Sequence, residues 1–120
     1  MSLTYSWELP ADSTAPGQGR CHVRELLTDR IEVADAELVV TELITNAWRY
    51  GRGPITLRAE ILEDGIRIEV CSESSDDPKM RAHGPASGGR GLLLVEELSR
   101  EWGYERAGGH LCVWAQVPAD

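Results

Sequence analysis

The stretch VVTELITNAWRYG, residues 39–51, decides the fold and raises the first question about function. At about 100° per residue its apolar side chains form one stripe, which predicts a helix with a single buried face. The stripe consists of Val39, Val40, Leu43, Ala47 and Tyr50. Glu42 and Asn46 lie one turn apart at the border of this stripe, and Arg49 lies further round. The pair is either an ordinary i,i+4 pair on a solvated flank or part of a binding site, and the helix alone does not decide.

Two further helices are predicted, one before and one after this helix in the chain. Between residues 16 and 33 the apolar residues recur at helical spacing, and residues 92–102 (LLLVEELSREW) repeat the pattern with Trp102 near their apolar face. The central helix opens with ADAELVV, where Asp35 can cap the free N–H groups of the first turn. Gly51 begins the run of glycine and proline that ends it.

The remaining periodic segments alternate as strands do. They are residues 3–9, 54–62, 65–73 and a closing hairpin over 102–118. Asp64-Gly65 is a favoured two-residue hairpin turn between the second and third of them. The segment 74–91 has no periodicity, and a loop of that length in a small domain is usually functional. The prediction for residues 1–120 is therefore one α+β domain, a two-layer sandwich in which about three helices cover a mixed, mostly antiparallel sheet.

Charge and composition exclude several function classes. A formal net charge of −8 argues against direct binding to DNA or RNA, because phosphate backbones require a basic surface. No apolar run approaches the ~18 residues of a membrane span, and the N-terminus resembles no signal peptide, so we expect a cytoplasmic protein without a membrane anchor. Cys21, Cys71 and Cys112 are odd in number and form no CxxC pair. We therefore expect small buried thiols rather than a zinc site or a disulfide framework.

A second unusual stretch, SGGRGLLLV at residues 87–95, lies where the long loop becomes a helix. Glycine backbone can approach a ligand closely, and the first turn of a helix presents unpaired N–H groups to an anion. The same glycines also fit a flexible hinge. The stretch is not a Walker loop, because no GK[ST] follows, and no parallel βαβ unit makes it a dinucleotide fingerprint.

The glycine-rich loop and the central helix fit a single binding site. A triphosphate held by such a loop needs a cation, and Mg²⁺ keeps several waters, so the side-chain carbonyl of Asn46 is a sufficient protein ligand. Glu42, one turn away, is placed to accept a proton from a hydroxyl group or a water. This combination explains why two polar side chains border a core face.

These residues, in this order, carry a family resemblance. ELITNAWRYG at 42–51, followed by a strand pair, a long loop and GGRGLLLV at 88–95, resembles the Bergerat-fold ATPases. That superfamily includes gyrase, the heat-shock-90 chaperones, histidine kinases and mismatch-repair ATPases. Within it the chain is most similar to the small single-domain serine kinases that act as anti-sigma factors in Gram-positive bacteria, and to stand-alone ATP-binding regulators of actinobacteria. The resemblance runs through nearly the whole chain.

The resemblance implies a site for ATP and Mg²⁺. Asn46 matches the magnesium-binding asparagine, and Glu42 matches the glutamate proposed as general base in the serine kinases. Arg49 and Tyr50 match the basic and aromatic positions that close this motif. Residues 75–90 match the ATP lid. The positions that match the loop around the triphosphate are Gly88, Gly89, Arg90, Gly91 and Leu92.

The chain departs from the family pattern at two positions. Ser72 stands where the family has an aspartate that reads the adenine amino group, with Ser74 at the small-residue position that follows. A serine still forms hydrogen bonds, but losing a charged acceptor costs on the order of 1–3 kcal/mol. The second departure is Cys112, in place of a threonine near the phosphate or adenine.

The first functional hypothesis is an ATP- and Mg²⁺-binding regulator that phosphorylates or sequesters a protein partner. By resemblance the partner is an anti-sigma antagonist carrying a target serine, a sigma factor, or both, and the regulator is a homodimer. The second hypothesis is a non-catalytic partner-binding module with the same fold that has lost ATP binding, and Ser72 and Cys112 motivate it. A histidine-kinase catalytic domain is disfavoured, because no dimerisation helix with a phosphorylatable histidine is predicted.

Overall fold

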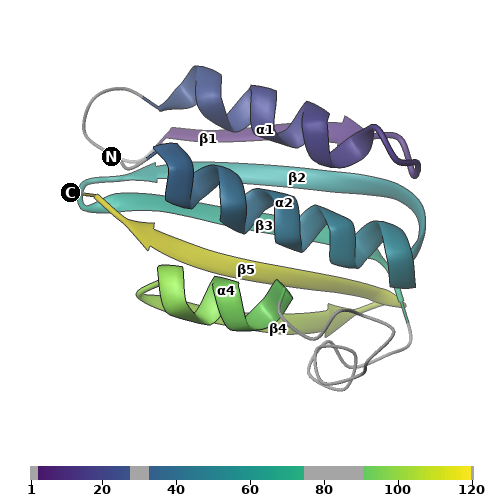
Figure 1. Cartoon of the computed structure of the whole chain (residues 1–120). Coiled ribbons are helices and arrows are strands. Elements are labelled where there is room, and N and C mark those ends of the chain that lie inside the picture. The colour runs from purple at the N-terminus through teal and green to yellow at the C-terminus, as the bar shows by residue number, and fades with distance from the viewer. Residues whose placement is uncertain (1–2, 28–32, 75–90, 120) are drawn as a thin grey trace.

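The computed structural model describes residues 3–27, 33–74 and 91–119, which form a five-stranded sheet with three helices on one face (Figure 1). The elements are β1 (Leu3–Leu9), α1 (Ala15–Leu26), α2 (Val33–Tyr50), β2 (Arg52–Leu62), β3 (Gly65–Glu73), α4 (Gly91–Leu98), β4 (Glu101–Ala107) and β5 (His110–Pro118). The predicted two-layer α+β sandwich is confirmed. The predicted lid at 75–90 lies outside the described residues.

The strands follow the order β1-β2-β3-β5-β4, and every pair among the described strands is antiparallel. The predicted mixture with parallel pairs is therefore not found in this part of the chain. Two hairpins, β2–β3 and β4–β5, supply the tight connections, and β5 joins them by pairing with β3. The Gly108-Gly109 turn of the second hairpin has φ values of 56° and 83°, which glycine adopts without steric cost.

Alternation along the strands separates a buried face from an open one. The side chains that face the helices are almost fully buried, as their spacing predicts: Ile55, Leu57, Ala59, Ile66, Ile68, Val70, Leu111, Val113, Ala115 and Val117. The opposite side of the sheet, called here the open face, is covered by no helix of the described residues. Its central residues are Thr56, Arg58, Arg67, Glu69, Cys71, Cys112, Trp114 and Gln116.

Helix α2 lies over the middle of the sheet, between α1 and α4 (Figure 1). Its buried residues are Ala36, Val39, Val40, Leu43, Ile44 and Ala47, close to the predicted stripe. Helix α1 packs against one flank, where a Cβ atom at Gly19 would lie within 3.0 Å of Ile44 Cδ1. On the same flank Arg20 Nη1 donates to Thr41 Oγ1 at 3.0 Å. Among the described residues, no helix is both long and apolar enough to cross a membrane.

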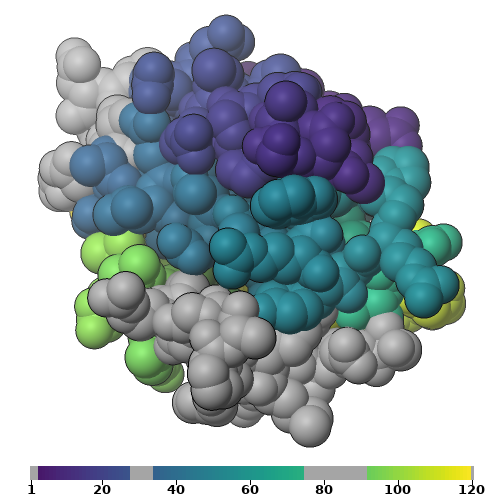
Figure 2. All heavy atoms as spheres, turned by 45° about the vertical axis from the view of Figure 1, so that its right-hand side comes forward, coloured from purple at the N-terminus to yellow at the C-terminus, as the bar shows by residue number. Residues whose placement is uncertain are grey.

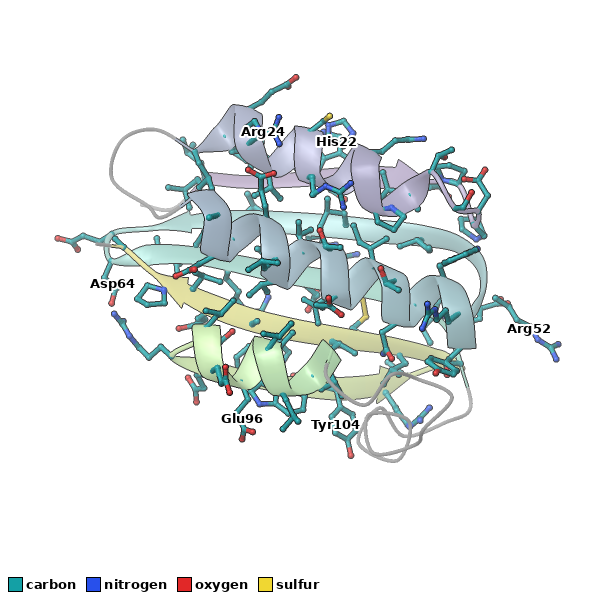
Figure 3. The ribbon with its side chains drawn as sticks, in the orientation of Figure 1. His22, Arg24, Arg52, Asp64, Glu96 and Tyr104 are labelled. Atoms are coloured by element: carbon teal, nitrogen blue, oxygen red, sulfur yellow. A yellow bond between two sulfur atoms is a disulfide. The ribbon has the colours of Figure 1, made fainter. Side chains whose placement is uncertain are left out.

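An ion pair closes the exposed rim of the α1–α2 contact. Arg24, labelled in Figure 3, donates from Nη2 to Glu37 Oε1 at 2.6 Å and from Nε to Oε2 at 3.3 Å. These hydrogen bonds hold the pKa of Glu37 below its usual value of 4.5, because they stabilise the carboxylate more than the acid.

Two helix boundaries differ from the sequence prediction. Helix α2 begins at Val33, so Asp35 lies inside its first turn, where it still meets the positive end of the helix dipole, and does not cap it. Helix α4 ends at Leu98, and Trp102 belongs to β4 instead of the helix. The reason is pairing with β5: Arg100 N–H donates to the carbonyl oxygen of Gln116 at 2.8 Å, and the edge strand β4 begins at the next residue, Glu101.

The β2–β3 turn is displaced by one residue from its predicted position. Leu62 pairs with Gly65, so the two turn residues are Glu63 and Asp64. Gly65 opens β3, where a Cβ atom would lie within 3.0 Å of the carbonyl oxygen of Val117. The glycine is therefore required by the close approach of β5 and not by the turn itself.

The prediction of small buried thiols is wrong for Cys71 and Cys112, which are bonded to each other, and wrong as to burial for Cys21, which is exposed. Cys71 of β3 and Cys112 of β5 lie directly opposite each other, with their Cα atoms 4.0 Å apart, and form a disulfide on the open face (Figure 3). They are separated by 41 positions in the chain, and only the β3–β5 register brings them together. Cys21 is a free thiol on α1 and is exposed.

Candidate functional site

The flank of α2 that faces away from α1 carries Glu42 and Asn46, both half-buried. Helix α1 contacts the flank that bears Thr41 and Ile44. At 3.6 residues per turn, Asn46 lies roughly 140° round the helix from Thr41. The two polar side chains are therefore directed toward the α4 side of α2, on consecutive turns.

The end of β3 supplies a buried hydroxyl group next to the last turn of α2. Ser72 is 4% exposed, and alternation places its side chain on the helix side of the sheet, with Leu111 as its partner on β5. A Cβ atom at Gly51 would lie 2.5 Å from Ser72 Oγ and 2.7 Å from the carbonyl oxygen of Ala47. The absence of a side chain at Gly51 thus lets the end of α2 approach Ser72 closely.

A cavity of about 710 Å³ opens beside these strand ends. It is lined by Tyr50 at the end of α2, by Arg52, by Glu73 and Ser74, and by the β4–β5 hairpin over residues 106–110. Figure 2 turns this end of the molecule toward the viewer, and Figure 3 shows Arg52 projecting from it. The volume falls in the range of small-molecule sites. Glu42, Asn46 and Ser72 are not among its lining residues, so this cavity adjoins the predicted site and shares only part of it.

Hydrogen bonds hold the wall of this strand-end cavity. The backbone N–H of Ser74 donates to the carbonyl oxygen of Gly109 at 3.3 Å, which extends the β3–β5 ladder past its last paired residues. Arg106 Nη1 donates to the carbonyl oxygen of Ser74 at 2.8 Å. The segment that leads out of β3 is therefore tied to the β4–β5 hairpin.

The cavity is locally basic although the whole chain carries a net charge of −8. Arg52 and Arg106 line it together with His110, and Glu73 is the acidic member of the lining. Sequence reasoning assigned no role to the three basic residues. Their common signal is position, because each lies within two residues of a glycine at a strand end, but only the fold shows that these ends meet.

The other predicted site residues lie on α2 and at the start of α4, or fall outside the described residues. Arg49 is exposed on α2. Gly91 is the first residue of α4, and Leu92 is 5% exposed with its side chain in the core, which leaves its backbone as the group available to a ligand. Gly88, Gly89 and Arg90 lie outside the described residues.

The structure does not bring Cys112 to the other predicted site residues. It lies on the open face and is bonded to Cys71, whereas Ser72 points to the helix side. The residue opposite Ser72 on the helix side is Leu111. The prediction that Cys112 borders a nucleotide is corrected on this ground, because neighbouring residues of a strand point to opposite faces.

Comparison with known families gives a match over most of the chain. Residues 18–117 match the model of the histidine kinase-like ATPase domain. The chain belongs to this family. The match begins in α1 and ends in β5, so it includes both the α2 flank and the strand ends described above. No curated protein sequence matches the chain.

A solved structure supports the same fold for this histidine kinase-like ATPase domain. The RsbU and RsbW domains of Rv1364c from Mycobacterium tuberculosis match with a TM-score of 0.74 and 18% sequence identity. The alignment covers 98% of this chain and 32% of that one, so the chain spans about a third of the neighbour's length. At this identity the likeness concerns the fold alone.

Proposed function

We propose that this chain is an ATP- and Mg²⁺-binding regulator that phosphorylates or sequesters a protein partner. The observation that carries the proposal is the pair Glu42 and Asn46, half-buried on the α4 side of α2 within a chain of the histidine kinase-like ATPase family. A solvated i,i+4 pair would need no such placement. The nucleotide then lies between this flank and the first turn of α4.

The donor groups fit Mg²⁺ and a nucleotide. Mg²⁺ prefers oxygen ligands and retains several waters, so the carbonyl oxygen of Asn46 is a sufficient ligand from the protein. The hydroxyl group of Ser72 both donates and accepts, which suits a base edge with both kinds of group. The first turn of α4, from Gly91, offers backbone N–H groups to phosphate oxygens. Bound ATP supplies the phosphoryl group.

Glu42 acts as the proton acceptor in this proposal. Its carboxylate is one turn from Asn46 and accepts the proton of the attacking hydroxyl group, from a partner's serine or from water. Asn46 would hold the cation, which would neutralise and orient the phosphates. The two residues therefore have separable roles, one in binding and one in transfer.

The proposed partner is a protein of the sigma-factor regulatory type: an anti-sigma antagonist that carries the target serine, a sigma factor, or both. The support is the resemblance of residues 42–51 and 88–95 to anti-sigma serine kinases, together with a fold shared with a structure that contains an RsbW domain. A cytoplasmic homodimer belongs to the same proposal.

A second candidate function is a non-catalytic module that binds a protein partner with the same fold and no nucleotide. Ser72 favours it, because a buried, uncharged hydroxyl group occupies the place where the family reads adenine with a carboxylate. A loss of about 1–3 kcal/mol weakens nucleotide binding roughly 5- to 150-fold.

Isothermal titration with ATP, with and without Mg²⁺, tests the proposal on three single variants. We expect Mg²⁺-dependent binding that Asn46→Ala weakens by about tenfold or more, which corresponds to ~1.4 kcal/mol. Glu42→Gln should retain binding but lose ADP formation, measured over hours with water as acceptor. Thr45→Ala is the matched control, since it is also half-buried on α2 but points to a different side of the helix.

The outcomes separate the two functions. Equal binding by the wild type and Asn46→Ala would remove Asn46 from the site. No heat up to millimolar ATP in the wild type would reject the nucleotide proposal and favour the partner-binding module. Loss of binding in Thr45→Ala would show that any change in α2 disturbs the domain, and thermal unfolding of each variant checks that explanation.

A further inference from the structure

The Cys71–Cys112 disulfide lies on the opposite face of the sheet from Ser72, one residue along β3. Cys71 precedes Ser72 in β3, and Cys112 follows Leu111 in β5. The disulfide therefore joins the two strands on the open face at the step next to the Ser72–Leu111 pair, whose side chains face the helices.

The disulfide is also the last covalent tie before the β3–β5 ladder ends. Beyond it remain the Ser72–Leu111 and Glu73–His110 pairs, and then the bond from Ser74 N–H to Gly109 O. Glu73, Ser74 and His110 line the strand-end cavity. Every residue that β3 and β5 contribute to the cavity wall thus lies between the disulfide and the open end of the ladder.

No helix of the described residues covers the bond on the open face. Cys71 is buried at 7% exposure, whereas Cys112 is half-buried. We therefore take Cys112, the more exposed residue of the two, as the one whose sulfur an incoming thiolate attacks, with Cys71 as the leaving group. Strand ends with few remaining pairs are the parts of a sheet that open at the lowest free energy.

We propose that the Cys71–Cys112 pair is a reversible thiol–disulfide switch that controls the order of the strand ends at Ser72–Ser74 and Gly109–Leu111. The oxidised form ties these ends together and the reduced form lets them open. Coupling to nucleotide affinity rests on the proposed ATP site, and there the oxidised form binds more tightly. If opening leaves about a third of the reduced molecules competent, the apparent affinity falls about threefold.

The reductant is a dithiol. Its first thiolate attacks Cys112 Sγ, the Cys71–Cys112 bond breaks, and Cys71 leaves as a thiolate that takes a proton from water. The second thiolate of the reductant then attacks the reductant's first sulfur, which is bonded to Cys112 in the mixed disulfide. Cys112 is released as a thiolate, which is also protonated. The reductant is oxidised to its own disulfide, and its two electrons end on the two protein thiols. Any disulfide-forming oxidant of the same class reverses the sequence.

The test compares oxidised and dithiothreitol-reduced protein in a Cys21→Ser background. Cys21 is the exposed free thiol, and its removal prevents exchange with the pair. Alkylation and intact mass count the free thiols, hydrogen exchange reports on residues 71–74 and 108–112, and titration with Mg²⁺ and ATP reports affinity. The control is Cys71→Ser with Cys112→Ser in the same background, in which dithiothreitol has no bond to reduce.

We expect reduction under native conditions, faster amide exchange at the strand ends and ATP binding weakened about threefold or more. A bond that stays intact in dithiothreitol, unchanged exchange after reduction, or an equal effect in the serine control would each overturn the switch. If both forms bind ATP equally and exchange equally, the nucleotide proposal stands and the switch does not. If exchange changes with redox state but neither form binds ATP, the switch stands and the nucleotide proposal fails.

Discussion

The contact between α1 and α2 depends on one missing methyl group, which makes Gly19→Ala an informative perturbation. An added Cβ atom would lie within 3.0 Å of Ile44 Cδ1, while its next neighbours, Ile44 Cγ1 and Val40 Cγ2, lie at an ordinary 3.6 Å. Ile44 is fully buried, so its terminal methyl group cannot move to solvent. Overpacking costs about 1–3 kcal/mol, and the better helix propensity of alanine returns about 1 kcal/mol. We expect a net loss of about 0–2 kcal/mol.

A second substitution isolates the clash. Ile44→Val removes the methyl group that an alanine at Gly19 would meet, and alone it costs about 0.5–1.5 kcal/mol. In the double variant the new Cβ atom fills the vacated space, so its stability should lie near that of the wild type. The coupling energy between the two sites then equals the sum of the two single losses, about 0.5–3.5 kcal/mol in favour of the double variant.

Urea unfolding followed by far-UV circular dichroism measures the stability of the wild type, the two single variants and the double variant, which together form a double-mutant cycle. Oxidising conditions keep the disulfide intact. Gly17→Ala is the matched control in the same helix, because its Cβ atom would meet only Arg20 Nη2 at 3.6 Å. It should be neutral or stabilising by up to about 1 kcal/mol. If Gly19→Ala stabilised the protein as Gly17→Ala can, or if the cycle were additive within about 0.5 kcal/mol, the packing argument would be refuted.

Three other perturbations follow from the structure. Gly51→Ala places a Cβ atom 2.5 Å from Ser72 Oγ, 2.7 Å from the carbonyl oxygen of Ala47 and 2.9 Å from that of Glu73. The variant should lose about 1–3 kcal/mol in urea unfolding, and Ser72→Ala should not restore the loss, because the backbone contacts remain. Gly103→Ala places one 2.9 Å from the Trp114 ring and should shift the indole N–H resonance of that residue, whereas an unchanged resonance would contradict the packing. Because the pKa of Glu37 is depressed on folding, its ionised form stabilises the protein above the usual carboxyl pKa of 4.5. The stability lost in Glu37→Gln should therefore be largest near neutral pH and should vanish as the pH falls through the depressed pKa, and a difference independent of pH would exclude the mechanism.

The parts of the fold set by local periodicity were predictable. The apolar stripe of α2 and the inward alternation of β2, β3 and β5 each depend on spacing within one segment, and their buried residues agree with the prediction. The α4–β4 boundary was not predictable in this way. Trp102 fits a helical spacing from Leu98 and a strand spacing with Tyr104 equally well, and pairing with β5 decides between them.

The disulfide required information that no single segment contains. The odd number of cysteines suggested unpaired thiols, but it only requires that one be left over, and the exposed Cys21 is that one. Which cysteines meet depends on the register between β3 and β5, which are separated in sequence by α4 and β4. The same register places Leu111 rather than Cys112 opposite Ser72.

For the candidate site, helix geometry was sufficient to place Glu42 and Asn46 together, but not to find the basic side chains near them. Arg52, Arg106 and His110 come from three separate strand ends that converge only in the folded chain. The ligand roles of Glu42 and Asn46 stay predictions, as do those of residues 88–90, which lie outside the described segments.

The one-sided sheet has a consequence for how such a domain diversifies. Along β3, residues that pack against the helices alternate with residues of the open face, so one strand contributes to two different surfaces. A substitution at Arg67 or Glu69 can change the charge of the open face while Ile68 and Val70 continue to pack beneath the helices. Relatives can thus inherit a common interior and acquire unrelated exteriors, and a chimera that exchanges only the open-face residues other than the two cysteines would change that face alone.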